Sequence, residues 1–290
     1  MADNRSALGK TTDAVPFNDK LILLAWAIGQ TKEQILAHPE KYVTLSTYFR
    51  FRHLLFRRKR GWPIAYLTGH KEFFGLDFIV NRHTLIPRPE TELIVEIAGN
   101  EIKKNKANKI ILIDVGTGTG CIPISILKKY NGAAEQANNI TAFASDISRA
   151  ALRVAKHNAK IHKVKITFLP GNLLKPAIHY LNLKNLQPTT LIITANLPYL
   201  TAEQYAAEST IKKEPRSALV AENNGLALYE KLFQQLRAVK QLNNQTIIVE
   251  IDPDQSAMLQ TMIKKNFPTA SAEIKKDLAG RDRAAVIWLS

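Results

Sequence analysis

The sequence predicts an α/β protein with a seven-stranded, mostly parallel sheet and a small helical domain in front of it. From Ile110 onward, short apolar segments alternate with segments of helical periodicity, and this alternation is typical of parallel sheets covered by helices. The first apolar segment runs into a glycine-rich stretch that opens a helix, as in nucleotide-cofactor sites. The chain has 290 residues, 46% of them hydrophobic, which is enough for a sizeable core.

The order of the patterns divides the chain into four parts. Residues 1–16 are polar and aperiodic, so we expect a loose terminus. Residues 17–63 show helical periodicity and indicate a small helical domain. Residues 64–86 are rich in strand formers around Gly75 and predict a β-hairpin linker. Residues 87–290 form the α/β domain.

The helical domain is expected to hold three helices. Thr31 and Gln34 predict a capping box at the start of the second. The third is predicted over 44–59, with these side chains facing inward: Leu45, Tyr48, Phe49, Leu54 and Leu55. Its outer face is basic, with Arg50, Arg52, Arg57, Arg58, Lys59 and Arg60. A solvated helix face and a docking surface both fit that pattern.

The α/β domain is expected to alternate strands and helices along most of its length. Strands are predicted at 110–115, 140–145, 165–169, 190–195, 246–251, 272–276 and 284–289. Helices are predicted at 93–102, 121–130, 147–160, 201–208, 226–240 and 255–265.

The stretch Gly116-Thr117-Gly118-Thr119-Gly120 follows the first of these strands, which carries the acidic Asp114. Glycines allow a tight turn and a close approach of the backbone to a ligand. The dinucleotide fingerprint is not met, because Cys121 stands where its last Gly or Ala belongs. The stretch therefore predicts a cofactor loop of another kind.

Two polar residues follow the next two strands. Asp146 could accept both hydroxyls of a ribose, or it could cap the following helix. Asn172 could reach an adenine amino group or cap a turn. Upstream, Arg88 lies between two prolines and Glu92 follows it. These two residues either face the same cleft or form a surface ion pair.

The stretch Asn196-Leu197-Pro198-Tyr199 lies at the carboxyl end of the strand 190–195. Pro198 holds Leu197 in an extended conformation. The Asn196 side-chain oxygen and the Leu197 carbonyl then present two acceptors, and Tyr199 adds an aromatic face. This set suits a planar NH2 group, although the tetrapeptide alone is equally well a strand-end turn.

Composition limits the partners and the compartment. The net charge of +15 fits either a solvated basic surface or an anionic partner such as RNA. The single Cys121 excludes an intramolecular disulfide and predicts a reducing compartment. No apolar run approaches the roughly 18 residues of a membrane span, and the apolar stretch at 21–29 does not match a signal peptide. No Cys or His pair has metal-ligand spacing, so no metal is expected.

These motifs resemble a known family. The glycine stretch with Asp114 resembles motif I of class I S-adenosylmethionine-dependent methyltransferases, and Asn196 to Tyr199 resembles the (N/D)PPY motif of those that methylate planar nitrogens. Further stretches resemble the PrmC/HemK family, the peptide chain release factor glutamine N5-methyltransferases: Ala65–Gly69, Thr84–Glu92, Glu214–Arg216 and Lys276–Arg283.

The resemblance implies a Rossmann-like catalytic domain behind a helical domain that contacts the release factor. The implied reaction transfers a methyl group from S-adenosylmethionine to the glutamine amide nitrogen of the Gly-Gly-Gln motif in class I release factors, leaving S-adenosylhomocysteine. The implied cofactor-binding residues are Asp114, Gly116, Thr117, Gly118, Thr119, Gly120, Asp146, Asn172, Leu173 and Asn196. The implied substrate-binding residues are Arg88, Asn196, Leu197, Pro198 and Tyr199, and we expect Asn196, Pro198 and Tyr199 to be catalytic. We expect a cytoplasmic monomer without a stable nucleic-acid partner or membrane contact.

The sequence departs from the family at two positions. Leu197 stands where the family usually has its first proline, and Leu173 stands where some relatives have an aromatic residue. Because the Leu197 carbonyl survives the exchange, we expect the amide clamp to survive as well. Two other readings stay open: a nucleic-acid methyltransferase acting on adenine N6 or cytosine N4, and a non-catalytic ribosome-associated binder that retains a cofactor pocket.

Overall fold

The computed structural model describes residues 3–4, 15–105, 109–130, 140–184, 190–237 and 245–289. The chain forms two compact units. The helical unit comprises Met1–His70 with Ser209–Lys213, and the sheet unit comprises Lys71–Glu208 with Glu214–Ser290. Most of the predicted loose terminus, residues 1–2 and 5–14, lies outside the described residues. Among the described helices, none combines the length and the apolar character that crossing a membrane requires.

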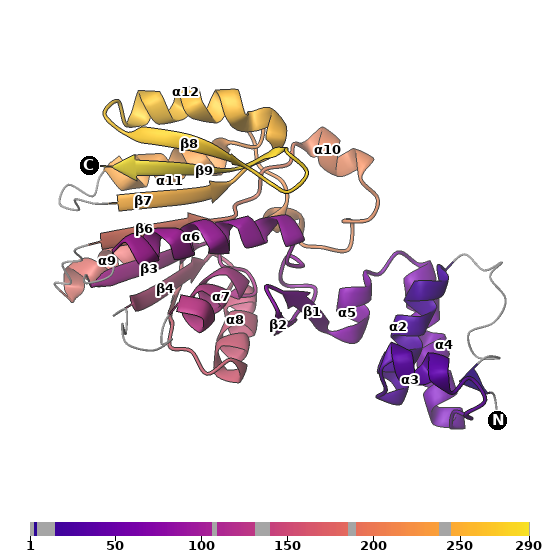
Figure 1. Ribbon diagram of the computed structural model, residues 1–290. Helices are drawn as coiled ribbons and strands as arrows, with labels where there is room; N and C mark the ends of the chain where they lie inside the picture. The colour runs from indigo at the N-terminus through magenta and orange to yellow at the C-terminus, as the bar shows by residue number, and fades with distance from the viewer. Residues whose placement is uncertain are drawn as a thin grey trace. The chain divides into compact units, whose positions relative to one another are not determined.

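In the described part of the helical unit the chain folds into helices joined by short connections (Figure 1). They are α2 (Phe17–Ile28), α3 (Lys32–Ala37), α4 (Leu45–Lys59) and α5 (Ile64–Thr68). The predicted capping box at the start of α3 is confirmed, because Thr31 and Gln34 each bond the other's backbone N–H. The prediction of strand structure from residue 64 is wrong, because Pro63 precedes a helix there. Gly69 ends this helix in the left-handed conformation, with a φ of 79°. The domain boundary therefore falls after His70 rather than before Ile64.

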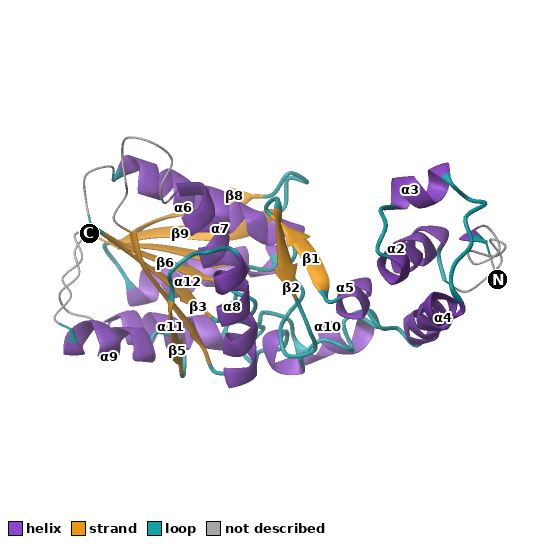
Figure 2. Ribbon diagram, turned by 90° about the horizontal axis from the view of Figure 1, so that it is seen from below, coloured by secondary structure: helices purple, strands orange, loops and turns teal. Residues whose placement is uncertain are grey.

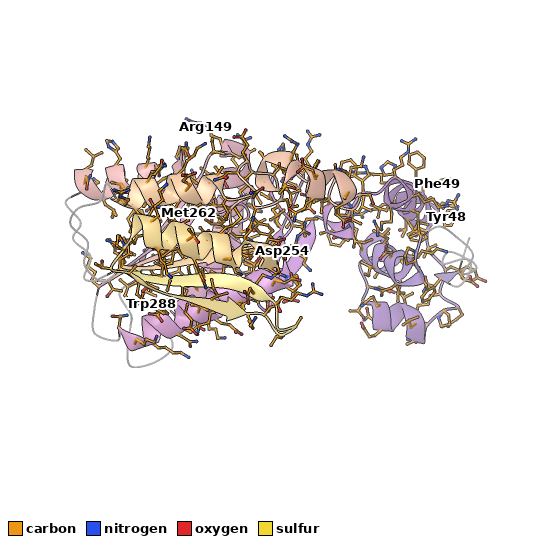
Figure 3. All side chains as sticks on the ribbon, turned by 90° about the horizontal axis from the view of Figure 1, so that it is seen from above. Tyr48, Phe49, Arg149, Asp254, Met262 and Trp288 are labelled. Carbon is orange, nitrogen blue, oxygen red and sulfur yellow. The ribbon has the colours of Figure 1, made fainter. Side chains whose placement is uncertain are left out.

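The inward face of α4 differs from the prediction. Leu54 and Leu55 are buried, but Leu45 and Phe49 are 63% and 69% exposed. Phe51 is fully buried in their place, because it lies three and four residues before Leu54 and Leu55 on the same helical stripe. Phe49 is labelled on the outside of the helical unit in Figure 3. Helix α4 thus carries apolar side chains on a buried face and also on an exposed one.

The sheet unit contains a hairpin and a seven-stranded sheet. The hairpin pairs β1 (His70–Phe73) with β2 (Leu76–Ile79). The sheet has the order β5-β4-β3-β6-β7-β9-β8; β9 pairs antiparallel with β7 and with β8, and the other neighbouring strands pair parallel. Its strands are β3 (Ile110–Val115), β4 (Ile140–Asp146), β5 (Thr167–Pro170), β6 (Thr190–Ala195), β7 (Gln245–Glu250), β8 (Ser271–Lys276) and β9 (Asp282–Leu289). Each begins and ends within two residues of its predicted position, and the predicted fold class is confirmed.

Helices cover both faces of this sheet (Figure 2). One face carries the hairpin with α6 (Glu92–Lys104), α7 (Cys121–Tyr130) and α8 (Arg149–Ile161), and the other carries α9 (Lys175–Leu183), α11 (Ala227–Arg237) and α12 (Ser256–Asn266). Helix α10 (Ala202–Ala207) and the short 3-10 helices η1 (Pro89–Thr91), η2 (Arg216–Ala218) and η3 (Pro253–Gln255) lie in the connections. Alternate residues of β3 enter opposite cores: Ile110 and Leu112 one, Ile111 and Ile113 the other.

Helix α9 is missing from the sequence-based prediction, and the end of one predicted helix lies outside the described residues. Because Pro176 breaks the helical pattern in the sequence, no helix is predicted there. In the structure Pro176 occupies the first turn of α9, where a proline costs no hydrogen bond. The predicted helix 226–240 is described only to Arg237, and 238–240 lie outside the described residues.

The topology creates a crevice at the carboxyl ends of the central strands. Strand β3 lies between β4 and β6, both parallel to it. The helices that follow β3 and β4 pack on one face of the sheet, and the helix that follows β5 packs on the other. The loops at the carboxyl ends of β3 and β6 therefore separate, and ligands of open α/β sheets bind at such points.

Asn158 of α8 fastens the hairpin beside this crevice. Its side-chain oxygen accepts from the Ile79 N–H at 2.9 Å, and its amide nitrogen donates to the Ile79 carbonyl at 3.0 Å. The same nitrogen donates to the Thr119 carbonyl at 2.9 Å. Asn158 is fully buried, so these bonds satisfy groups that water cannot reach. One side chain therefore joins the hairpin, α8 and the glycine loop.

We predict that Asn158→Ala destabilises the protein. Leaving the Ile79 N–H unpaired costs about 1–3 kcal/mol, so the thermal midpoint should fall clearly below that of wild type. The neighbouring His157→Ala, at an exposed position of α8, is the control and should stay within about 0.5 kcal/mol. Equal melting curves for the two variants would contradict the structural role of Asn158.

Candidate active site

A cavity of about 370 Å³ lies at the carboxyl ends of β3, β4 and β6. Its walls come from the segment before α6, the glycine loop, and the turns that follow β4, β5 and β6. Most of the predicted site residues line it: Arg88, Gly116, Thr117, Gly118, Thr119, Asp146, Asn172, Leu173, Asn196, Leu197 and Pro198. Asp114, Gly120 and Tyr199 are not among the described residues of the wall.

The three glycines of the loop do different work. All have positive φ: 73° at Gly116, 54° at Gly118 and 80° at Gly120. A Cβ on Gly118 would meet nothing within 4 Å, so the loop is open beside the cavity at this point. A Cβ on Gly120 would lie 3.1 Å from Ile124 and 3.2 Å from Ala155. Gly120 therefore brings α7 and α8 close together instead of facing the cavity.

Asp146 presents its carboxylate at the cavity. Its two oxygens accept the backbone N–H groups of Gly118 at 2.9 Å and Ser148 at 2.8 Å. The cap of α8 is Ser148, whose hydroxyl accepts from Ala151, so the capping alternative for Asp146 is wrong. Burial raises the pKa of Asp146, and the two N–H bonds oppose that rise. Each carboxylate oxygen has a second acceptor position for a hydroxyl group.

Apolar and amide groups border the same end of the cavity. Leu173 is buried and Ile147 is 76% exposed, and both line the wall together with the exposed Asn172. Leu173 adopts a φ of 52°, and its carbonyl accepts the Ser145 hydroxyl at 2.7 Å. The wall here suits a flat, partly apolar ring with a polar edge.

Asp114 lies beneath the loop rather than in the cavity wall. It is 1% exposed, and its carboxylate accepts the Thr194 hydroxyl of β6 at 2.7 Å. Burial raises the pKa of Asp114 to about 7, although the Thr194 bond lowers it. The residue links β3 to β6 and supports the glycine loop from below.

Arg88 lines the cavity and is anchored by a buried carboxylate. Its guanidinium donates to Glu214 at 2.6 Å, and the Glu214 side chain is only 2% exposed. The second Glu214 oxygen accepts the Ile86 N–H at 3.0 Å. The pair is therefore a structural clasp on the segment 86–88, not a surface ion pair. Glu92 serves the hairpin instead, since it accepts the Phe74 N–H at 2.8 Å.

Asn196 is held by residues that the sequence did not single out. Its amide nitrogen donates to the Thr91 hydroxyl at 3.0 Å, and that hydroxyl donates to Glu250 at 2.6 Å. Burial raises the pKa of Glu250 to about 7, while the bonds from Thr91 and Tyr199 lower it. A signal for Glu250 exists in the sequence, because it is a carboxylate at the carboxyl end of an apolar strand, as Asp146 is. Thr91 gives no such signal.

Tyr229 holds the next residue of the loop. The Leu197 N–H donates to the Tyr229 hydroxyl at 3.2 Å, and that hydroxyl donates to the Glu250 carbonyl. Leu197 and Tyr229 are 3% and 0% exposed. A proline at 197 would have no N–H to offer, so Tyr229 satisfies the donor that Leu197 introduces and fixes its backbone by other means.

Tyr199 is fixed at both ends of the residue. Its hydroxyl donates to Glu250 at 3.2 Å, and its carbonyl accepts from Gln255 at 2.9 Å. Gly225 permits this packing, since a Cβ there would lie 1.9 Å from the Tyr199 carbonyl oxygen. The predicted stacking of the Tyr199 ring on a substrate stays a prediction.

Known proteins resemble this chain along nearly its whole length. The family model described as the PrmC N-terminal domain matches residues 5–69. A release factor glutamine methyltransferase from Enterococcus faecalis is 36% identical over 261 residues, covering 89% of this chain and 87% of the relative. Another from Dictyoglomus turgidum is 33% identical over 271 residues, covering 92% and 89%.

A solved structure shares the fold. The crystal structure of the hMettl16 catalytic domain in complex with MAT2A 3'UTR hairpin 6 has a TM-score of 0.54 at 16% identity, covering 83% of this chain and 81% of that one. At that identity the likeness concerns the fold alone.

We predict that Tyr229→Phe destabilises the protein by about 1–3 kcal/mol, because it leaves the buried Leu197 N–H unpaired. The loss should be smaller in a Leu197→Pro background, where that N–H does not exist. Thermal unfolding of the four proteins of this double-mutant cycle measures the coupling. Additive effects would show that Tyr229 does not act on Leu197.

We predict that Asp114→Asn changes the pH dependence of stability. The folded pKa of Asp114 is about 7, above its ordinary 3.8, so its favourable contribution is full below about pH 4 and is lost as the pH rises through about 7. The variant should therefore gain stability relative to wild type across this window. Glu96→Gln, at an exposed position of α6, is the control. A constant difference in melting temperature from acid to neutral pH would contradict the prediction.

Proposed function

This chain belongs to the release factor glutamine methyltransferase family, and from that premise we propose that it methylates the glutamine side chain of a class I release factor at the amide nitrogen, N5, within the Gly-Gly-Gln motif. The methyl donor is S-adenosylmethionine. The catalytic work falls to the sheet unit, whose cavity brings the glycine loop and the Asn196–Tyr199 loop together.

The observation that carries the proposal is the pair of acceptors at the cavity wall. Asn196 and Leu197 both line the cavity, and each is held by a bond that leaves its oxygen for another donor: Asn196 through its amide nitrogen and Leu197 through its N–H. A primary amide nitrogen carries two hydrogens and lies in a plane with its carbonyl. Two fixed acceptors can take both hydrogens and thereby set the plane and direction of the nitrogen.

The acceptors also answer the chemical difficulty of the reaction. An amide nitrogen is a poor nucleophile, because its lone pair is delocalised into the carbonyl. Orientation toward the methyl carbon at roughly 3–3.5 Å removes much of the entropic barrier. Positive charge grows on the nitrogen as the bond forms, so the Asn196 oxygen and Leu197 carbonyl stabilise the transition state more than the ground state. The proton can leave after transfer, without a strong base beforehand.

The cavity residues fit S-adenosylmethionine. The Asp146 carboxylate suits the ribose hydroxyls, the Leu173 wall with Asn172 suits the adenine, and the open backbone at Gly118 allows close approach. Thr117 and Thr119 complete this side, with Gly116 beside Leu197. When bound, the cofactor supplies an electrophilic methyl group on a sulfonium. Asp114 and Gly120 support the loop from behind the wall.

The remaining features agree with this assignment. Pro198 restrains Leu197, and the clasped Arg88 offers a cation beside the incoming substrate. The buried, single Cys121 suits the reducing cytoplasm in which release factors act. We infer a monomer that works on a protein substrate, and the RNA-directed reading is retained only as an arm of the test.

The direct test offers labelled S-adenosylmethionine with a class I release factor and, separately, with total RNA. We expect label in the release factor, located by mass spectrometry on the glutamine of Gly-Gly-Gln. A release factor with that glutamine changed to alanine should take up none. Label in RNA alone would overturn the proposal in favour of a nucleic-acid target, and cofactor binding without transfer to either would favour a non-catalytic binder.

We predict that Asn196→Ala lowers turnover on the release factor on the order of 10²–10³-fold, by analogy with the loss of one preorganised polar contact. Asn266→Ala, at the end of α12 and outside the cavity wall, is the matched control and should retain wild-type turnover. Wild-type turnover in Asn196→Ala would mean that this amide does not hold the substrate.

A further inference from the structure

We propose that Glu250 and Thr91 are positioning residues that fix which end of the Asn196 amide faces the substrate. The inference rests on the proposed function, since it concerns the same site. It assigns a role to two residues that do not belong to the Asn196–Tyr199 motif and that lie on η1 and β7.

The geometry begins at a carboxylate that only accepts. Glu250 ends β7 and is 1% exposed. One of its oxygens lies 2.6 Å from the Thr91 hydroxyl, and the other lies 3.2 Å from the Tyr199 hydroxyl. An ionised carboxylate has no hydrogen to give. Both hydroxyls must therefore point their hydrogens at Glu250.

This requirement passes through Thr91 to Asn196. A hydroxyl group has one hydrogen, and that of Thr91 is spent on Glu250. Thr91 can then only accept from Asn196, so the amide nitrogen, and not the amide oxygen, lies against it at 3.0 Å. The Asn196 oxygen is turned away from Thr91 on a residue that lines the cavity. A substrate NH2 group has only hydrogens to offer, and it needs that oxygen.

Without the acceptor at Glu250, the order of donors could reverse. Thr91 could donate to the Asn196 oxygen, and the flipped amide would present its own NH2 to the substrate NH2. Two donors facing each other repel, so the substrate nitrogen would lose both its partner and its direction. The Glu250 carboxylate thus sets the direction of the two hydrogen bonds that join Asn196, Thr91 and Glu250.

Several charged or titratable groups surround Glu250. Arg283 on β9 favours its ionised form, while Glu90 on η1 opposes it. The Tyr199 hydroxyl donates to the Glu250 side chain, and the Tyr229 hydroxyl donates to the Glu250 carbonyl. Burial raises the pKa of Glu250 to about 7, although the bonds from Thr91 and Tyr199 and the charge of Arg283 lower it. Protonation supplies a hydrogen that the carboxylate otherwise lacks. The orientation of Asn196 should therefore relax as the pH falls through about 7.

The test compares Thr91→Val with Thr91→Ser. Valine keeps the shape and removes the hydroxyl, so we expect kcat at saturating cofactor to fall about 10- to 100-fold, by analogy with the loss of a group that orients a metal ligand. Serine keeps the hydroxyl and should stay within about threefold of wild type. The affinity for S-adenosylhomocysteine, measured by calorimetry, should change by less than about twofold in both.

Glu250→Gln provides the second variant, in case Thr91→Val does not fold. Wild-type kcat should rise with pH through about 7, and the glutamine variant should be slower and lack that step. Equal turnover of Thr91→Val and wild type, equal impairment of valine and serine variants, or an unchanged pH step in Glu250→Gln would each overturn the proposal.

A readout that needs no substrate separates this inference from the proposed function. In a protein labelled with ¹⁵N-asparagine, the Asn196 side-chain amide signals should shift with pH around 7 in wild type and not in Thr91→Val. Inactivity of wild type on the release factor would refute the proposed function alone. Absence of the pH-dependent shift in wild type would refute the positioning of Asn196 by Glu250 and Thr91 alone.

Discussion

The in-register pairing of β3 with β6 is the constraint on which the site depends. Val115 lies opposite Ala195, so Gly116 and Asn196 leave the sheet at the same level and side by side. The two loops nearly touch there: a Cβ on Gly116 would lie 2.9 Å from the Leu197 side chain. A shift by one residue would send every side chain of β6 to the opposite face. Such a shift would also separate Asp114 from its register partner Thr194 and break their buried 2.7 Å hydrogen bond.

Much of this arrangement is local in origin and could be predicted from the sequence. The strands are continuous apolar runs with clear ends, and the glycine loop and the Asn196 loop follow two of them directly. Parallel strands bring their carboxyl ends together, so Asp146 and Asn196 could be placed at one crevice before any contact was known. Helix α9 was not predicted, because the sequence does not distinguish a proline in the first turn of a helix from a proline that breaks one.

What could not be predicted depends on contacts between distant parts of the chain. Thr91 precedes Asn196 by 105 residues, and Tyr229 follows Leu197 by 32; no periodicity encodes such pairs. The outward turn of Leu45 and Phe49 has the same cause, since α4 has enough apolar residues for two faces and only packing with its neighbours chooses one. Gly120 and Asp114 show a related limit: the motif was recognised, but packing decided which members face the cavity.

The bond between Leu197 and Tyr229 bears on how this sequence can change over evolutionary time. A proline at this position would carry its rigidity in its own ring, whereas the backbone of Leu197, in the loop after β6, is fixed by Tyr229 on α11. A replacement of Leu197 by proline leaves no N–H that needs a partner, and Tyr229 keeps its bond to the Glu250 carbonyl. A loss of Tyr229 costs less stability after that replacement than before it. The two positions thus form an ordered pair, in which one sequence of replacements stays folded throughout and the reverse sequence passes through a weakened intermediate.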